Sequence, residues 1–270
     1  MGWSALFVRW AAIPASASAF YRVLIAAAVL VPWRAVRGGS RTPDRRGMRL
    51  ALLGGAFFAG DLVLFNSAVL RTTAATAVLL GNNAPIFVGL GTWIIFKDRP
   101  RAAFWAGLAL ALGGCAFIVL ADASSGGSVA GDVTGDLFAL SAAIFWAAYM
   151  VTTAHVRTAM DTLTFNTFAV AGSVVALLVI CLVLRVPLWG YSGRTWAALL
   201  ALGLVSQLAS YYALVYALGH LPATVTSVSV LAQVPLTAVL AAVMLGEPLS
   251  GAQIAGGLIV LSGIYVVSKP

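Results

Sequence analysis

The chain consists of long apolar runs separated by short polar loops, and this pattern constrains its fold more than any other feature. Each run approaches the roughly 20 residues that a membrane-spanning helix needs. Of the 270 residues, 61% are hydrophobic and 9% are charged, whereas about 25% are charged in a typical soluble domain. Lipid offers backbone groups no hydrogen-bond partner, so the runs are predicted to be helices. They cover residues 17–33, 48–70, 73–96, 102–121, 136–153, 163–184, 195–218, 223–245 and 251–267.

One further run, residues 2–13, ends at Pro14 and is too short to span a membrane. About 12 helical residues rise roughly 18 Å, against about 30 Å of hydrocarbon. We therefore expect either a half-helix or a natural start upstream of Met1. With this run, the sequence predicts an all-α, polytopic membrane helix bundle of about ten transmembrane helices.

The cations between the runs predict the orientation in the membrane. The net charge is +8, and most of the 16 Lys and Arg residues lie in loops on one predicted side. Loops that remain in the cytoplasm carry the excess of Lys and Arg. We therefore expect an integral protein of the cytoplasmic (inner) membrane with a cytoplasmic C-terminus. The cations on this side are Arg34, Arg37, Arg41, Arg45, Arg46, Arg49, Lys97, Arg99, Arg101, Arg157 and Lys269.

The two halves of the chain resemble each other. The segment 82–85 (NNAP) matches 232–235 (AQVP), and the glycines of 107–114 match the small residues of 256–263. In this register Met1 corresponds to Ile144, so we expect the first half to be N-terminally incomplete. An odd number of spans per half gives the halves opposite orientations, as in many secondary transporters. The predicted parts are a first repeat at 1–121, a Gly/Ser-rich linker at 122–135 and a second repeat at 136–270.

Two segments, one in each half, carry a recognisable pattern. Residues 60–100 read GDLVLFNSAVLRTTAATAVLLGNNAPIFVGLGTWIIFKDRP. Residues 217–267 read ALGHLPATVTSVSVLAQVPLTAVLAAVMLGEPLSGAQIAGGLIVLSGIYVV. Both segments resemble the EamA-type permeases of the drug/metabolite transporter superfamily. The resemblance implies ten helices in two inverted five-helix repeats around a central cavity. It also implies the export of amino acids or other small metabolites.

Two charged residues lie inside the runs. Asp61 is in the middle of run 48–70, where a charge costs roughly 2.5–3.5 kcal/mol. It is interpreted as a proton-coupling carboxylate, a counter-ion for a substrate amine, or a structural partner of another helix. Arg22 follows two aromatic residues just inside run 17–33. It could extend to the outer interface, pair with a carboxylate or bind a substrate anion.

Uncharged polar residues recur at equivalent places in the two halves. Thr76 and Asn83 lie seven residues apart, as do Thr226 and Gln233, so each pair is predicted to share a helix face. Together with Asn82 they are interpreted as the lining of a cavity, and hydrogen bonds between helices are the alternative.

Pro85 and Pro235 are predicted to kink their helices, because proline removes a backbone donor. Such kinks are candidate hinges for alternating access, although static kinks are common in membrane helices. Four more residues are candidates for an apolar wall with polar tips. They are Trp3, Tyr149, Gln207 and Tyr211, which stands at the repeat position of Asp61.

Motifs of common enzymes do not occur in the sequence. Neither of the two lysines, Lys97 and Lys269, follows a glycine, so there is no P-loop. The sequence also holds no HExxH motif, no Cys/His cluster of metal-ligand spacing and no GxSxG turn. We therefore expect no enzymatic activity, no cofactor, no metal and no nucleic-acid partner. The expected partners are a small-molecule substrate, the lipid bilayer and, if Asp61 titrates, protons.

These patterns together predict a secondary transporter that exports a small organic metabolite, an amino acid or an amphipathic compound, by alternating access. A non-transporting membrane scaffold or sensor is the alternative, and it predicts that all polar residues inside the spans are paired. A membrane-embedded enzyme would need clustered catalytic groups at one interface.

Overall fold

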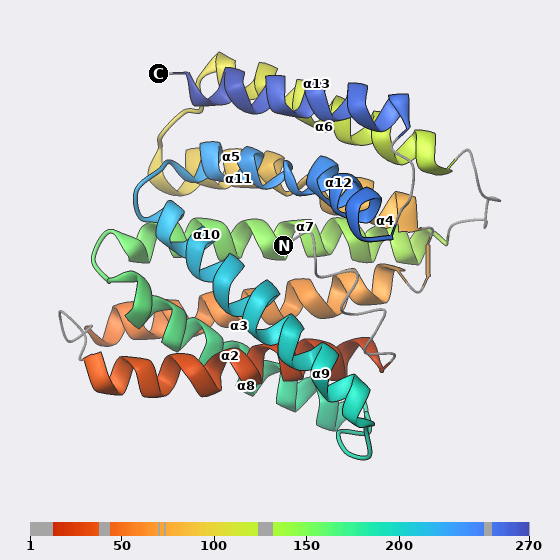
Figure 1. Ribbon diagram of the computed structural model, residues 1–270. Coiled ribbons are helices and arrows are strands. Elements are labelled where there is room, and N and C mark those ends of the chain that lie inside the picture. The colour runs from red at the N-terminus through yellow and green to blue at the C-terminus, as the bar shows by residue number, and fades with distance from the viewer. Residues whose placement is uncertain are drawn as a thin grey trace. The chain divides into compact units, whose positions relative to one another are not determined.

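The structure is a computed structural model that describes residues 13–37, 44–69, 71–72, 74–123, 132–245 and 250–269. Every regular element within these ranges is a helix (Figure 1). The elements are α2 (Ala15–Arg37), α3 (Arg45–Val69), α4 (Ala74–Gly81), α5 (Ala84–Phe96), α6 (Ala102–Ala123), α7 (Val133–Arg157), α8 (Thr162–Val183), α9 (Gly193–Ala201), η1 (Leu202–Ala209), α10 (Ser210–Leu218), α11 (Ala223–Val230), α12 (Gln233–Leu245) and α13 (Gly251–Ser268).

Nine helical stretches within the described residues are long and apolar enough to cross a membrane. The predicted run 102–121 is confirmed as the span Ala102–Ala121. The other eight spans agree with their predicted runs to within a few residues. The predicted fold class, an all-α polytopic membrane helix bundle, is confirmed. The short run at 2–13, and with it Trp3, lies almost wholly outside the described residues.

Two of the nine spans are broken in the middle, at equivalent places of the two halves. One consists of α4 and α5 with a break at residues 82–83, and the other of α11 and α12 with a break at 231–232. Proline lacks a donor and its ring clashes with the carbonyl four residues earlier. For Pro85 and Pro235 that carbonyl belongs to Gly81 and Leu231, so each break falls where an α-helical bond is lost. The expected kinks are therefore breaks, and their role as hinges stays a prediction.

Both breaks keep their backbone groups bonded by tighter turns of the 3₁₀ type. In the first, the Asn83 amide N–H donates to the Leu80 carbonyl at 3.2 Å. In the second, the Leu231 and Ala232 N–H groups donate to the carbonyls three residues earlier, at 3.0 and 3.1 Å. The Asn83 side chain also donates to the carbonyls of Leu79 and Leu80, at 2.8 and 3.3 Å. Asn83 thus caps the end of α4.

The chain divides into two compact units that do not coincide with the predicted sequence repeats. Unit 1 holds α2, α3 as far as Asn66, α8, α9, η1 and α10, and unit 2 holds the last residues of α3, α4 to α6 and α11 to α13. The continuous helix α7 contributes residues up to Ala147 to unit 2 and the rest to unit 1. Each unit therefore combines helices from both halves of the sequence. The repeat boundaries themselves stay a prediction.

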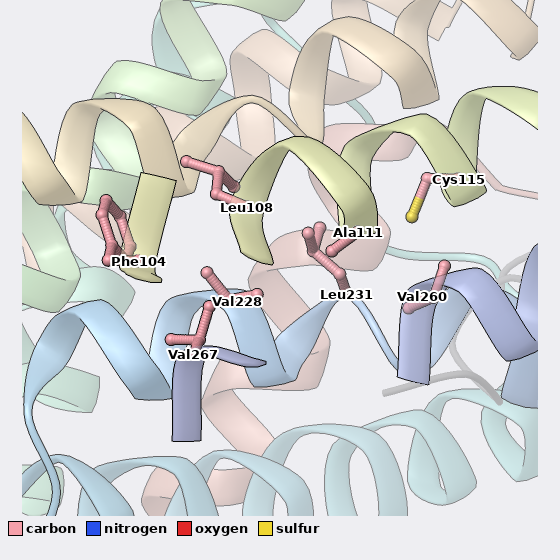
Figure 2. Packing of buried hydrophobic residues seen from close by; sticks show 8 residues of the cluster. All are labelled: Phe104, Leu108, Ala111, Cys115, Val228, Leu231, Val260 and Val267. Carbon is pink, nitrogen blue, oxygen red and sulfur yellow. The ribbon is translucent and has the colours of Figure 1, made fainter. Parts of the chain in front are cut away.

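The core of unit 2 forms where α6 and α13 lie side by side (Figure 1). Figure 2 shows eight of its buried side chains: Phe104, Leu108, Ala111, Cys115, Val228, Leu231, Val260 and Val267. They come from α6, from α13, and from α11 with the break after it. The backbones approach closely because glycines face each other. A Cβ on Gly114 would lie 2.7 Å from the Gly256 carbonyl oxygen, and one on Gly107 would lie 2.5 Å from that of Gly263.

Unit 1 uses the same kind of contact where α3 crosses α8. A Cβ on Gly55 would lie 1.9 Å from the Ala169 carbonyl oxygen, so only glycine fits there. The Ser173 hydroxyl has two carbonyl acceptors within hydrogen-bond distance for its one proton, that of Gly55 at 2.8 Å and that of Ala169 at 2.9 Å. Small residues and polar hydrogen bonds of this kind hold membrane helices together, because lipid provides no hydrophobic drive between them.

Asp161 begins α8, just outside the span, as its N-cap. Its side chain accepts a hydrogen bond from the Thr164 N–H at 2.9 Å. Partial burial raises the pKa of this carboxyl, but the hydrogen bonds from Thr164 and the charge of Arg157 outweigh burial and leave the pKa below its usual 3.8. The carboxylate is therefore favoured by folding. Its contribution to stability is complete above the unfolded pKa and is lost as the pH falls through the folded one.

We expect Gly114→Ala to lower the free energy of unfolding by about 1–3 kcal/mol, since the new Cβ would meet the backbone of α13. The matched control is Gly113→Ala, because nothing lies within 4 Å of a Cβ at Gly113. Alanine there should be neutral or slightly stabilising. The unfolding temperatures of both variants in detergent test this packing. Equal melting of the two would contradict the close contact.

We expect Asp161→Ala to lower stability by about 1 kcal/mol at pH 7, since α8 loses its cap. The difference between wild type and variant should shrink as the pH falls below about 4, because the wild-type carboxyl then becomes protonated. Unfolding temperatures measured from pH 7 to pH 3 provide the check. A difference that stays constant over this range would show that the charge of Asp161 does not contribute.

Candidate functional site

Helix α2 buries a charged side chain inside unit 1. Arg22 is only 7% exposed, although it lies within a membrane-spanning helix. Its Nε donates a hydrogen bond of 2.9 Å to Oε1 of Gln207, which is 2% exposed. Arg22 therefore points into the unit, and it does not extend along the helix towards the membrane interface.

Aromatic rings surround the Arg22 guanidinium. Its Cζ lies 5.9 Å from the ring centre of Phe58 and 5.6 Å from that of Tyr211, both within cation–π range. The Phe58 ring lies 4.8 Å from Tyr211 and 5.4 Å from Tyr149, centre to centre. Sequence reasoning missed Phe58. It stands three residues before Asp61, on the same face of α3, and this spacing was the available signal.

Asp61 provides the opposite charge. It is half-buried in the middle of α3 and interacts electrostatically with Arg22 and with Tyr211. An ionised Asp61 thus balances the charge of Arg22 within unit 1. We call the following six residues the Arg22–Asp61 cluster: Arg22, Phe58, Asp61, Tyr149, Gln207 and Tyr211.

The helix that carries Gln207 is irregular at that point. The sequence predicts one continuous helix over 195–218, but the segment η1 has the wider π-helical turn. Short π-helical segments are uncommon and often occur at functional sites. Beside Gln207, the Ser206 hydroxyl is buried and has no hydrogen-bond partner among the described residues. The same holds for Ser18, which precedes Arg22 by one turn of α2. Helices α2 and η1 therefore each bury one hydroxyl that has no hydrogen-bond partner among the described residues.

The other predicted site residues lie on the broken spans of unit 2. Thr76 is in α4, Asn82 and Asn83 form the first break, Thr226 is in α11 and Gln233 begins α12. Because a break separates the members of each pair, the helical spacing that predicted a shared face does not apply. Asn83 and Thr226 bond to carbonyls of their own span. The Asn82 Nδ2 is buried without a partner in the described part of the chain.

The structure therefore brings together five predicted residues, Arg22, Asp61, Tyr149, Gln207 and Tyr211, in unit 1. Within the described ranges, no three His, Cys, Asp or Glu side chains gather as a metal site would require. A buried guanidinium beside a carboxylate and aromatic rings can bind an anion, exchange a proton, or do both. The roles of the individual residues stay predictions.

Comparison with known proteins gives a consistent result. The model of the EamA-like transporter family matches residues 1–120 and 133–269. YwfM, an uncharacterized transporter of Bacillus subtilis (strain 168), is 32% identical over 209 residues, which cover 76% of this chain and 68% of YwfM. An uncharacterized transporter of Archaeoglobus fulgidus is 27% identical over 260 residues, or 93% of this chain and 86% of its own. A protein crystal structure with 24% identity shares the fold, with a TM-score of 0.83 over 99% of this chain and 93% of that one.

The Arg22–Asp61 cluster predicts a characteristic pattern in a double-mutant cycle. Arg22→Met and Asp61→Asn should each lower the free energy of unfolding by about 2–3 kcal/mol, because each leaves one charge unbalanced inside the protein. The double variant removes both charges, so it should be more stable than the sum of the single losses implies. Unfolding temperatures of the four proteins in detergent measure the coupling. Strictly additive losses would show that the two charges do not interact.

Proposed function

We propose, from the premise that this chain belongs to the EamA-like transporter family, that it is a secondary transporter of a small organic metabolite. The substrate is an amino acid or an amphipathic compound, and transport proceeds by alternating access. The chain has nine candidate spans within its described residues, as an integral membrane protein of a transporter family requires. The substrate class, the mechanism and the direction are parts of the proposal.

The Arg22–Asp61 cluster is the observation that carries this proposal. Charged residues inside membrane spans are costly, and they commonly mark the paths of substrates, ions or protons. Here a cation that is 7% exposed and an acid in the middle of a span interact inside one unit. Aromatic rings beside them offer an apolar surface for the body of an organic substrate.

The broken spans of unit 2 give the proposal a second support. Discontinuous helices are typical of secondary transporters. In them, the ends of the half-helices at the break and nearby polar side chains contact substrates or ions. The breaks at 82–83 and 231–232 carry Asn82 and Asn83 in one span and precede Gln233 in the other. We place these amides, with Thr76 and Thr226, among the groups that contact the substrate during transport, and Pro85 and Pro235 at the hinges.

We place the protein in the cytoplasmic membrane with its C-terminus in the cytoplasm, because the Arg-rich loops follow the positive-inside rule. Export is the proposed direction. The proposed activity moves a compound without changing a covalent bond, so no enzymatic step is included. A scaffold or sensor would pair its polar groups inside the spans, whereas Ser18, Ser206 and Asn82 each carry a buried polar atom without a partner among the described residues.

Asp61 is the proposed proton carrier, since protonation would remove the charge that balances Arg22. We expect the wild-type protein in proteoliposomes to release one or more labelled amino acids or small amphipathic metabolites at a rate that depends on a pH gradient. Asp61→Asn should abolish this dependence, because the amide cannot titrate in the relevant range. The measurement is efflux from preloaded vesicles with and without the gradient.

The matched control is Asp98→Asn, which removes an exposed carboxylate outside the spans and should leave the gradient dependence unchanged. Selective release that keeps its full gradient dependence in Asp61→Asn would refute the proton role but leave transport intact. The absence of any protein-dependent release from a protein that melts cooperatively would refute transport of the tested compounds.

A further inference from the structure

The described part of the chain buries Arg22 more fully than any other charged side chain. The 2.9 Å hydrogen bond from its Nε to Gln207 fixes one edge of the guanidinium. The rings of Phe58 and Tyr211, at 5.9 and 5.6 Å, lie near it. These contacts are neutral, so they orient the cation but do not balance its charge.

Asp61 balances the charge of Arg22, and groups from several helices lie around it. Arg22 of α2 and Tyr211 of α10 interact with it electrostatically. From α7, Tyr149 reaches Phe58, the residue one turn before Asp61. Where α8 meets α3, near Gly55, the nearest atoms belong to Ala169 and Ser173, which do not titrate. Asp61 therefore carries the one carboxyl among the six residues of the cluster.

A buried cation without an anion beside it is strongly unfavourable in a medium of low dielectric constant. When Asp61 takes up a proton, Arg22 loses its counter-ion while Gln207 and the rings continue to hold it in place. We infer that the transported compound is a monocarboxylate whose carboxylate then replaces that of Asp61 beside Arg22. This inference rests on the proposed transport function and specifies its substrate class and the sign of its coupling.

The charges in the cluster limit the kind of anion. The cluster holds one guanidinium and one carboxyl, so a singly charged anion restores neutrality and a doubly charged phosphate ester would exceed it. Arginine binds carboxylates through paired hydrogen bonds, which gives such a site directional selectivity. The rings of Phe58, Tyr149 and Tyr211 favour a compound with an apolar body. An amine on the substrate has no required partner here, because Asp61 is neutral in the loaded state.

The exchange of counter-ions couples the proton and the substrate in a definite sense. A proton binds to the Asp61 carboxylate, and the substrate carboxylate then binds beside Arg22, so both enter together. On the other side of the membrane both leave, and Asp61 again balances Arg22. For an amine-free monocarboxylate the net charge moved is zero. Efflux therefore carries a proton outwards with each anion, and it is driven by the gradient of the acid itself.

The test uses the full-length protein in proteoliposomes and matched pairs of probes. The vesicles are loaded with labelled L-leucine, L-phenylalanine or the amine-free acid 3-phenyllactate, each compared with its carboxamide. Release from protein-free vesicles is subtracted. We expect protein-dependent release of one or more acids, including 3-phenyllactate, and less than about one tenth of that rate for the carboxamides. An acidic vesicle interior should accelerate efflux, and an acidic exterior should slow it.

Three variants test the roles of the two charges. Asp61→Asn imitates the protonated carboxyl, so at pH 7.5 it should bind the transported acid about tenfold more tightly than wild type, as measured by thermal shift of the purified protein. Arg22→Gln should lose acid-dependent thermal shifts and release, and Arg22→Lys should restore part of both. Arg34→Gln is the control. Arg34 also lies on α2, but it contacts Thr164 and Phe168 outside the cluster, so acid release should be unchanged.

The outcomes separate this inference from the proposed function. Release of acids and carboxamides at equal rates, or efflux accelerated by an acidic exterior, would overturn the inference while transport itself stands. A loss of acid binding in an Asp61→Asn protein that still melts cooperatively would also overturn it, because Asp61 would then contribute to binding as an anion. If no compound is released, the proposed function fails for this panel. The thermal shift of Asp61→Asn with acid against carboxamide still decides the inference.

Discussion

The lack of hydrogen-bond partners in hydrocarbon is the constraint on which the rest of this structure depends. It explains why each described span is helical and why so many hydroxyls, such as those of Thr153 and Thr167, bond to a carbonyl one turn earlier. It also explains the form of the two breaks, where 3₁₀ turns and the Asn83 side chain replace the lost α-helical bonds. At the two breaks of the described spans, these bonds keep the irregular backbone hydrogen-bonded.

The same constraint acts on charges and gives the Arg22–Asp61 cluster its character. A guanidinium inside a span is stable only with an opposite charge and oriented dipoles beside it. Here these come from α3 and η1, while α2 supplies the cation itself. Helices α2 and α3 come from the first half of the sequence and η1 from the second, yet all three contribute to this one unit. The cluster is therefore a product of the tertiary fold and not of a local motif.

The sequence predicted the spans well because run length and hydropathy follow directly from bilayer thickness. It also singled out Arg22 and Asp61, since a charge within an apolar run is conspicuous. The small residues of 107–114 and 256–263 were recognised as a feature of the repeat, and in the structure they lie where α6 and α13 meet. The sequence did not reveal Phe58, because a three-residue spacing from Asp61 is a weak signal for one aromatic residue among many. The exact breaks and the division into units depend on which helices pack together, which hydropathy does not encode.

The π-helical turn of η1 has a geometric consequence for the helix that contains it. A π turn holds one residue more than an α turn, and each residue of an α-helix advances by about 100° around the axis. If η1 adopted α-helical geometry, α10 would therefore rotate relative to α9 by roughly that angle about the helix axis. Tyr211 and Gln207 stand on either side of the end of this segment. The wide turn therefore determines how the side chains of Gln207 and Tyr211 are oriented towards Arg22. One additional residue in this turn sets the rotation of α10 about the helix axis.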